Sequence, residues 1–175
     1  MGASSHRLIV DTLRAGADRF GFRLIEYSVQ SNHVHLLVEV PDRHALTRGA
    51  KGLFVRLAKQ LNRAWGRRGQ VFAERFHARA LCSPREVRRA LAYVLHNARR
   101  HGSHGSGIDP HSSGPWFDGF STRRERDDPA AEFIRRMASW APVVCRATSW
   151  LLRVGWRRCG PIAVEERVLA WSEPG

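Results

Sequence analysis

Apolar residues recur at the spacing of an amphipathic helix in two stretches of the chain, and a helix start signal marks a third. The first helix is expected over residues 5–20, and the second over residues 43–65 with Asp42 as its N-cap. The third is expected from Pro84 to about residue 100, because Ser83-Pro84-Arg85-Glu86 combines a capping box with a proline at the first helical position. The apolar stripe of the second helix indicates that it packs on the core, and we expect the third helix to pack against the sheet.

Between the first two helices the pattern changes to that of a β-hairpin. Residues 22–29 and 32–40 are the two predicted strands, and the polar pair Gln30-Ser31 lies at the centre of the turn. This register places Ser28 opposite His33. The pattern as a whole predicts an α+β fold, with an antiparallel sheet and helices packed on it.

Two histidines separated by one residue lie at the start of the second strand. Because side chains alternate faces along a strand, His33 and His35 are expected on one face, where both imidazoles can bind one metal ion. In the predicted register Glu26 lies opposite His35, and Tyr27 faces the other side of the sheet. Two ligands hold a metal weakly, so the site needs a further ligand from elsewhere in the chain.

Two polar residues on the third predicted helix can complete a catalytic centre. Tyr93 and Asn97 are four residues apart and therefore lie on the same helix face. Asn97 can offer its amide oxygen as a third metal ligand, and Tyr93 can offer an oxygen nucleophile for cleavage of a DNA phosphodiester. The other of the two tyrosines, Tyr27, is expected to face away. The expected product is a 5′-phosphotyrosyl enzyme with a free 3′-hydroxyl on the DNA.

The donor set indicates the class of metal. Imidazole nitrogens with an amide oxygen, and without thiolate or carboxylate, favour loosely bound Mg²⁺ or Mn²⁺ over a structural zinc ion. Neutral ligands leave the ion its full charge, which can offset the anion that develops at phosphorus. A phenol keeps its proton at neutral pH, so a metal or a base must lie near Tyr93 when it attacks.

The charge of the chain points to its partner. The 175 residues include 29 Lys and Arg against 16 Asp and Glu, a formal net charge of +13. Such an excess favours a polyanionic partner, of which nucleic acid is the commonest, whereas the alternative is a solvated arginine-rich surface. The basic residues that we expect to contact DNA are Arg48, Lys51, Arg56, Lys59, Arg63, Arg67, Arg68, Arg75 and Arg79.

The cysteines and the apolar segments of the sequence indicate the cellular compartment in which the protein works. The three cysteines are far apart and form no C-x-x-C pair, so neither a disulfide framework nor a zinc knuckle is expected. The sequence shows no signal-peptide pattern and no apolar run long enough to span a bilayer. We therefore expect a reducing, cytoplasmic setting without a membrane partner.

Composition divides the chain beyond the third helix. Residues 5–101 form the predicted catalytic domain, residues 102–128 a loop or linker, and residues 129–175 a helical to irregular tail that is basic and aromatic. The tryptophans and arginines of residues 150–158 can stack on bases, or they can dock on the domain through an apolar face. Residues 70–81 fit an irregular strand.

Three motifs, in the correct order, resemble those of the single-tyrosine transposases of the IS200 type, and within them the branch associated with repetitive extragenic palindromes. Residues 31–38, Ser-Asn-His-Val-His-Leu-Leu-Val, are similar to the family's Asn-His-hydrophobic-His-Leu-Leu motif, and residues 69–77 to a second motif. Residues 93–99 resemble the family's Tyr-x-x-x-Asn-Pro-Val helix, with Ala98 in the place of the proline. The resemblance covers about residues 20–120.

This resemblance implies a ferredoxin-like domain that cuts and joins single-stranded DNA beside a hairpin in a metal-dependent reaction. By position, His33, His35 and Asn97 are the implied metal ligands, and Tyr93 is the implied nucleophile. The family begins with a strand before its first helix, whereas this chain starts almost at that helix, so the first strand of the sheet is expected to be missing. We expect the chain to act as a monomer or a homodimer.

Two other functions compete with that of a transposase. One is a truncated or domesticated protein that binds structured DNA or RNA without cutting it. The other is a structural domain stabilised by zinc. Covalent attachment of DNA separates the first from an active transposase, and stoichiometric, tightly bound zinc would identify the second.

Overall fold

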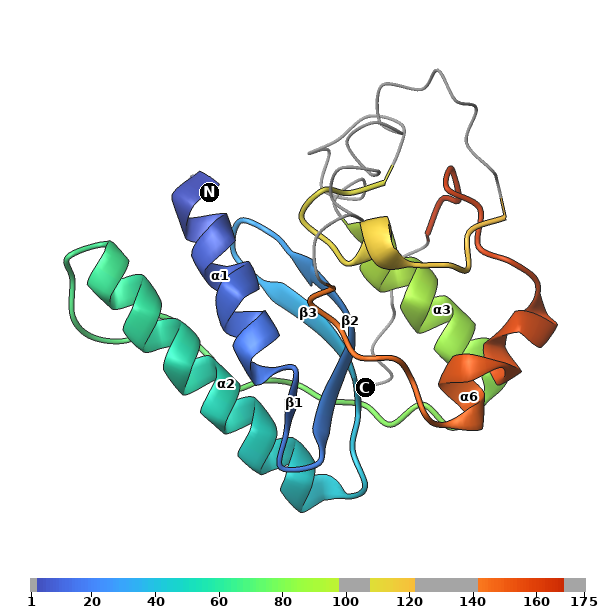
Figure 1. Ribbon diagram of the computed structural model, residues 1–175, viewed down its shortest axis with the longest axis horizontal. Helices are drawn as coiled ribbons and strands as arrows, with labels where there is room; N and C mark the ends of the chain where they lie inside the picture. The colour runs from blue at the N-terminus through green and yellow to red at the C-terminus, as the bar shows by residue number, and fades with distance from the viewer. Residues whose placement is uncertain (1–2, 98–107, 122–141, 169–175) are drawn as a thin grey trace.

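A computed structural model describes residues 3–97, 108–121 and 142–168, and a three-stranded antiparallel sheet lies at its centre. Helices α1 and α2 lie on one side of the sheet and α3 on the other (Figure 1). The predicted α+β class, an antiparallel sheet with packed helices, is confirmed. In chain order the elements are α1 (Ala3–Gly16), β1 (Asp18–Arg19), β2 (Phe22–Val29), β3 (Val34–Glu39), α2 (Arg43–Ala64), α3 (Pro84–Leu95), η1 (Gly114–Trp116), α6 (Trp150–Arg153) and η2 (Gly155–Cys159).

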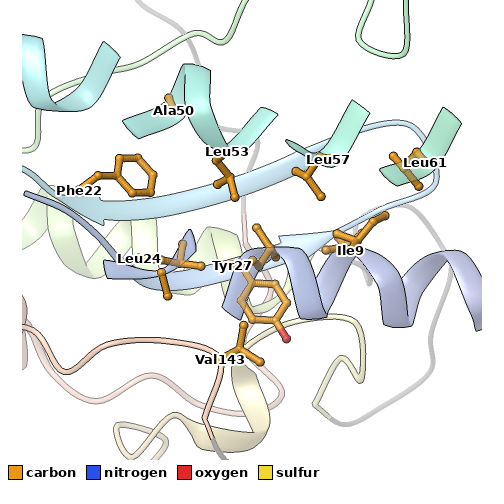
Figure 2. Close-up of a cluster of buried hydrophobic side chains, with 12 residues drawn as sticks. Ile9, Phe22, Leu24, Tyr27, Ala50, Leu53, Leu57, Leu61 and Val143 are labelled. Carbon is orange, nitrogen blue, oxygen red and sulfur yellow. The ribbon is translucent and has the colours of Figure 1, made fainter. Parts of the chain in front are cut away.

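The larger core lies between the sheet and the pair α1 and α2. Side chains of α2 pack onto β2, and Ile9 of α1 and Val143 belong to the same cluster (Figure 2). Leu53 and Leu57 are each 1% exposed, which is the burial expected for the apolar stripe of an amphipathic helix. Burial of each such side chain stabilises the fold by about 1.5–3 kcal/mol.

A β-bulge keeps the apolar residues of β2 on this core. Tyr27 faces α1 and α2, and strict alternation from it would turn Leu24 away from them. The pairing with β3 slips by one residue between Leu24 and Glu26, so Phe22, Leu24 and Tyr27 all reach the same core. The bulge therefore follows from the spacing of apolar residues, and it leaves Glu26 on the face toward α3.

The predicted register of the hairpin is wrong by two residues. Ser28 pairs with His35 rather than His33, and Glu26 pairs with Leu37 rather than His35. The cause is Gln30, which is buried and donates from its side chain to Ser28 Oγ, 2.8 Å away. Its backbone N–H donates to the His33 carbonyl, so the turn is centred on residues 31 and 32. A two-residue shift preserves the faces, because side chains alternate with period two.

Two other predicted elements differ from the structure. The first helix ends at Gly16 rather than near residue 20, because β1 forms a tight turn with β2 through Phe20 and Gly21, both with positive φ. Residues 70–81 form no strand, so that prediction is wrong. Their aromatic side chains Phe72 and Phe76 pack instead against Phe54 of α2, while the backbone runs along the surface.

The far segments of the chain cover the second edge of β2. Cys145 N–H donates to the Leu24 carbonyl over 2.7 Å, and Ser113 N–H donates to the Tyr27 carbonyl over 2.9 Å. Trp156 is 2% exposed in a second core with α3, as the docking alternative expects, whereas Trp150 stays 51% exposed. Residues 98–107 and 122–141, which include about half of the predicted linker and the first part of the predicted tail, lie outside the described residues.

Strand β3 lies at the edge of the sheet. Within the described ranges no strand precedes α1, and β3 pairs with β2 alone. A strand edge presents backbone N–H and C=O groups that a further strand can pair with.

The structure also has, across the described residues, no helix that is both long and apolar enough to cross a membrane.

Candidate active site

The two histidines lie together at the start of β3, on the sheet face toward α3. Their rings contact each other edge to face, with centroids 4.7 Å apart. Both are half-buried. His33 precedes the first residue of β3, and its Nδ1 lies 2.7 Å from the side-chain oxygen of Asn32. A hydrogen bond at Nδ1 favours the tautomer in which Nε2 keeps its lone pair for a ligand.

Tyr93 reaches the histidines from α3. The predicted capping box is present: Ser83 Oγ accepts from Glu86 N–H, and the Glu86 carboxylate accepts from Ser83 N–H. The helix is anchored by a buried apolar face that includes Val87 and Leu91. Its Tyr93 ring lies edge to face with His35, with centroids 5.0 Å apart. The nucleophile predicted from the sequence is therefore placed beside the predicted metal ligands.

Asn97 lies just beyond the C-cap of α3 and completes the group. It is 1% exposed, and its side-chain nitrogen lies 3.1 Å from His33 Nε2. Its Oδ1 is buried and has no hydrogen-bond partner among the described residues. A buried acceptor without a donor is costly unless something else satisfies it, and a cation does so. The structure thus brings Tyr93, His33, His35 and Asn97 together.

This group fits a metal ion by the chemistry of its donors. The O and N positions of an amide side chain are assigned rather than observed, and a half-turn of the Asn97 amide would place its oxygen beside His33 Nε2. Two imidazoles and an amide oxygen match the donor set proposed for Mg²⁺ or Mn²⁺. The part of the chain that is described holds no group of three or more His, Cys, Asp or Glu side chains able to bind a metal.

The second tyrosine is placed in the core. Tyr27 is 1% exposed in the cluster between the sheet and the helices α1 and α2 (Figure 2). Burial raises the pKa of its phenol, with smaller effects of Arg14, Asp109 and Glu26. A phenol that is buried and hard to ionise is a poor nucleophile, so Tyr93 is the tyrosine that the geometry favours.

One ionisable residue near this face was not singled out from the sequence. Glu26 is 7% exposed, and burial raises the pKa of its carboxyl to about 8 although a hydrogen bond from Ser113 opposes the shift. At neutral pH the carboxyl is therefore protonated. Ser113 lies 87 residues away in the sequence, so no local pattern could have indicated this contact.

The predicted DNA-binding residues fall into two groups. Most lie on exposed surface, as expected of phosphate contacts. Arg56 is different, because it is half-buried between α1 and α2, where Gly16 leaves room for its guanidinium. Arg79 is held by an ion pair of 2.7 Å with Glu86. The exposed residues that remain are Arg48, Lys51, Lys59, Arg63, Arg67, Arg68 and Arg75.

Comparison with known proteins bears on this group of residues. A family model described as "Transposase IS200 like" matches residues 6–97, more than half of the chain, and this range includes His33, His35, Tyr93 and Asn97. No curated protein and no solved structure matches the chain significantly.

Proposed function

Because the chain belongs to the family of IS200-like transposases, we propose that it cuts and rejoins single-stranded DNA through a covalent bond to Tyr93. The observation that supports this proposal most is the ring contact between Tyr93 and His35, with His33 and Asn97 beside them. The finer placement, in the branch associated with repetitive extragenic palindromes, belongs to the proposal, as does a hairpin next to the cleavage site.

In the proposed reaction the Tyr93 oxygen attacks a backbone phosphorus atom. A bond forms between the phenolic oxygen and the 5′-phosphate, and the bond from phosphorus to the 3′-oxygen breaks. The phenolic proton leaves to solvent or to a nearby base, and the departing 3′-oxygen takes up a proton. Attack by a 3′-hydroxyl on the phosphotyrosine reverses these changes and rejoins the strand without a nucleotide cofactor.

His33, His35 and Asn97 are the proposed ligands of a divalent cation, Mg²⁺ or Mn²⁺. When bound, such an ion offsets the negative charge that develops on the phosphate oxygens. The half-buried position of the two histidines leaves one side of the group open to a substrate. Exposed arginines and lysines around the domain would hold the DNA backbone through phosphate contacts.

A labelled single-stranded oligonucleotide with a palindromic hairpin tests the proposal. With Mn²⁺, a label at the 3′ end should shift to the size of the protein on a denaturing gel, whereas a label at the 5′ end should appear in a shorter free fragment. Tyr93→Phe should abolish both products, and Tyr27→Phe, which alters a core phenol, is the matched control for loss of a tyrosine hydroxyl.

The same experiment separates the alternatives. Salt-sensitive binding without an adduct, unchanged by a chelator, would favour a protein that binds structured DNA or RNA without cutting. An adduct that survives Tyr93→Phe would refute the proposed nucleophile. Metal analysis of the purified protein that found one tightly bound zinc ion per chain would favour the structural zinc domain.

A further inference from the structure

The outer side of α2 has a continuous basic surface. A row of exposed side chains lies within one third of the circumference of this helix, and we call it the outer stripe: His44, Arg48, Lys51, Val55, Lys59 and Arg63. The helix has no Asp or Glu, although its N-cap is Asp42. From Arg48 to Arg63 the stripe is about 22 Å long, at roughly 1.5 Å per residue.

An exposed phenylalanine lies at one end of the outer stripe. Phe20 is 67% exposed, and the guanidinium carbon of Arg48 lies 5.6 Å from its ring centroid. Its φ of 57° is in the left-handed region, which a residue with a bulky side chain rarely adopts. The turn with Gly21 is of the kind that favours Asn-Gly. A strained position that holds an aromatic ring in solvent indicates a function for the ring.

An exposed tryptophan lies at the other end. Trp65 is the C-cap of α2 and is 45% exposed. Its indole N–H donates to Ser5 Oγ over 3.1 Å, which fixes the ring, and the guanidinium carbon of Arg67 lies 4.9 Å from its centroid. Each end of the outer stripe thus has an exposed ring with an arginine over it. Aromatic faces beside a row of cations are the means by which proteins hold unpaired bases and their phosphates.

The outer stripe is separated from Tyr93 by the sheet. Helix α2 packs on one face of the sheet and α3 lies across the other (Figure 1). A strand of DNA bound at Tyr93 cannot lie along the outer stripe over the same nucleotides. At roughly 3.4 Å per nucleotide, the stripe matches about six nucleotides of a second segment.

We propose that the outer stripe, with Phe20 and Trp65 at its ends, binds a single-stranded segment of DNA distinct from the segment that reacts at Tyr93. The choice of DNA over RNA rests on the proposed function, but the stacking and charge argument does not. The charge near Phe20 agrees with a polyanion, because Arg48 is unopposed by any acidic residue of α2. Asp18 shares the guanidinium of Arg23 with Glu39, at 3.7 Å and 3.2 Å.

Binding measured in a Tyr93→Phe background tests this proposal without cleavage. The probe is a fluorescent 20-nucleotide single strand without a hairpin, compared with a duplex of the same sequence. Phe20→Asn should weaken single-strand binding about fivefold or more, because base stacking on an aromatic ring has that effect or a larger one. The same change should raise Tm by about 2–4 °C, because Asn suits the left-handed turn. A merely structural phenylalanine would instead lower Tm when removed.

Removal of positive charges from the outer stripe is the second part of the binding experiment. Lys51→Gln with Lys59→Gln should reduce the slope of log K against log salt by about 1.4, at roughly 0.7 for each lost contact with a single strand. The matched control, Arg7→Gln with Arg14→Gln, removes two exposed charges from α1 outside the stripe and should change the slope by less than half as much. Equal effects of both pairs, or an unchanged affinity of Phe20→Asn, would overturn the proposal.

These outcomes are independent of those for catalysis. If the wild-type protein forms no adduct but the stripe variants weaken binding, the proposed reaction fails and the outer stripe stands. If the adduct forms and the stripe variants bind single strands like the wild type, the outer stripe fails and the reaction stands. Tighter binding of the duplex, unaffected by Phe20→Asn, would contradict the single-strand assignment.

Discussion

The raised pKa of Glu26 predicts that the protein loses stability between pH 6 and pH 8, and Glu26→Gln is expected to remove most of that loss. The Glu26 carboxyl is buried and accepts a hydrogen bond from Ser113, and burial raises its pKa to about 8 from the ordinary 4.5. Glutamine has nearly the same shape and an amide oxygen that can accept the same bond, but it has no proton to lose.

The magnitude follows from the two pKa values. Between pH 6 and 8 the unfolded chain has already released the Glu26 proton, while the folded protein still holds it, so stability falls as pH rises through this range. At about 1.4 kcal/mol for each pH unit, and with half of the folded protein ionised at pH 8, the wild type loses about 2 kcal/mol. For a chain of this size, that loss lowers Tm by about 4–8 °C.

Urea unfolding followed by circular dichroism at pH 6, 7 and 8 measures the effect as a difference between variant and wild type. The matched control is Glu166→Gln. The hydrogen bonds and charge of Arg88 lower the pKa of Glu166, so its contribution is constant above pH 6 and is lost only in acid. If Glu26→Gln has the same pH dependence as the wild type, the Glu26 carboxyl is ionised in the folded protein and this reasoning is wrong.

Two further predictions concern the packing of α2 and the ionisation of His6 on α1. Gly49→Ala should destabilise the fold by about 1–3 kcal/mol, because a Cβ there would overlap the Phe22 ring. Gly52→Ala, whose Cβ meets no atom within 4 Å, should stabilise the fold by about 0.5–1 kcal/mol. Chemical denaturation compares the two variants, and changes in unfolding free energy of the same sign would contradict the packing. Burial, with a smaller effect of His111, lowers the pKa of His6 to about 4, so the unfolded chain takes up this proton first and stability should fall as pH drops below 6.5. His6→Phe should flatten that fall, and an unchanged profile would mean that His6 is ionised in the folded state.

Local patterns predicted most of the elements. The capping box at Ser83 identified the start of α3 to the residue, and the hairpin pattern identified β2 with its bounds. Both signals are local, because the partners lie within four residues of each other or in one strand. The proximity of Tyr93 and Asn97 to the histidines also agrees with the placement expected from one strand face and one helix face.

The predictions from the sequence fail where contacts between residues far apart in the chain determine the structure. The pairing register shifted by two residues, and the centre of the turn by one, because the buried side chain of Gln30 binds Ser28 and lies within reach of Asp109. Residues 70–81 have an extended pattern but pair with no strand, and their rings Phe72 and Phe76 pack against Phe54 of α2 instead. The high pKa of Glu26 results from burial, which outweighs the opposing hydrogen bond from Ser113, and no spacing in the sequence indicates either contact.

The roles of the four site residues remain predictions, and identification of the residue that binds DNA tests them most directly. After reaction with a hairpin oligonucleotide and Mn²⁺, nuclease and trypsin digestion should leave a nucleotide phosphate on the peptide of residues 90–99, which contains Tyr93. Tandem mass spectrometry should place the added mass on Tyr93, through a 5′-phosphate. A modification on the peptide of residues 24–43, which contains Tyr27, or no modified peptide from a reaction that cleaves the DNA, would contradict the account.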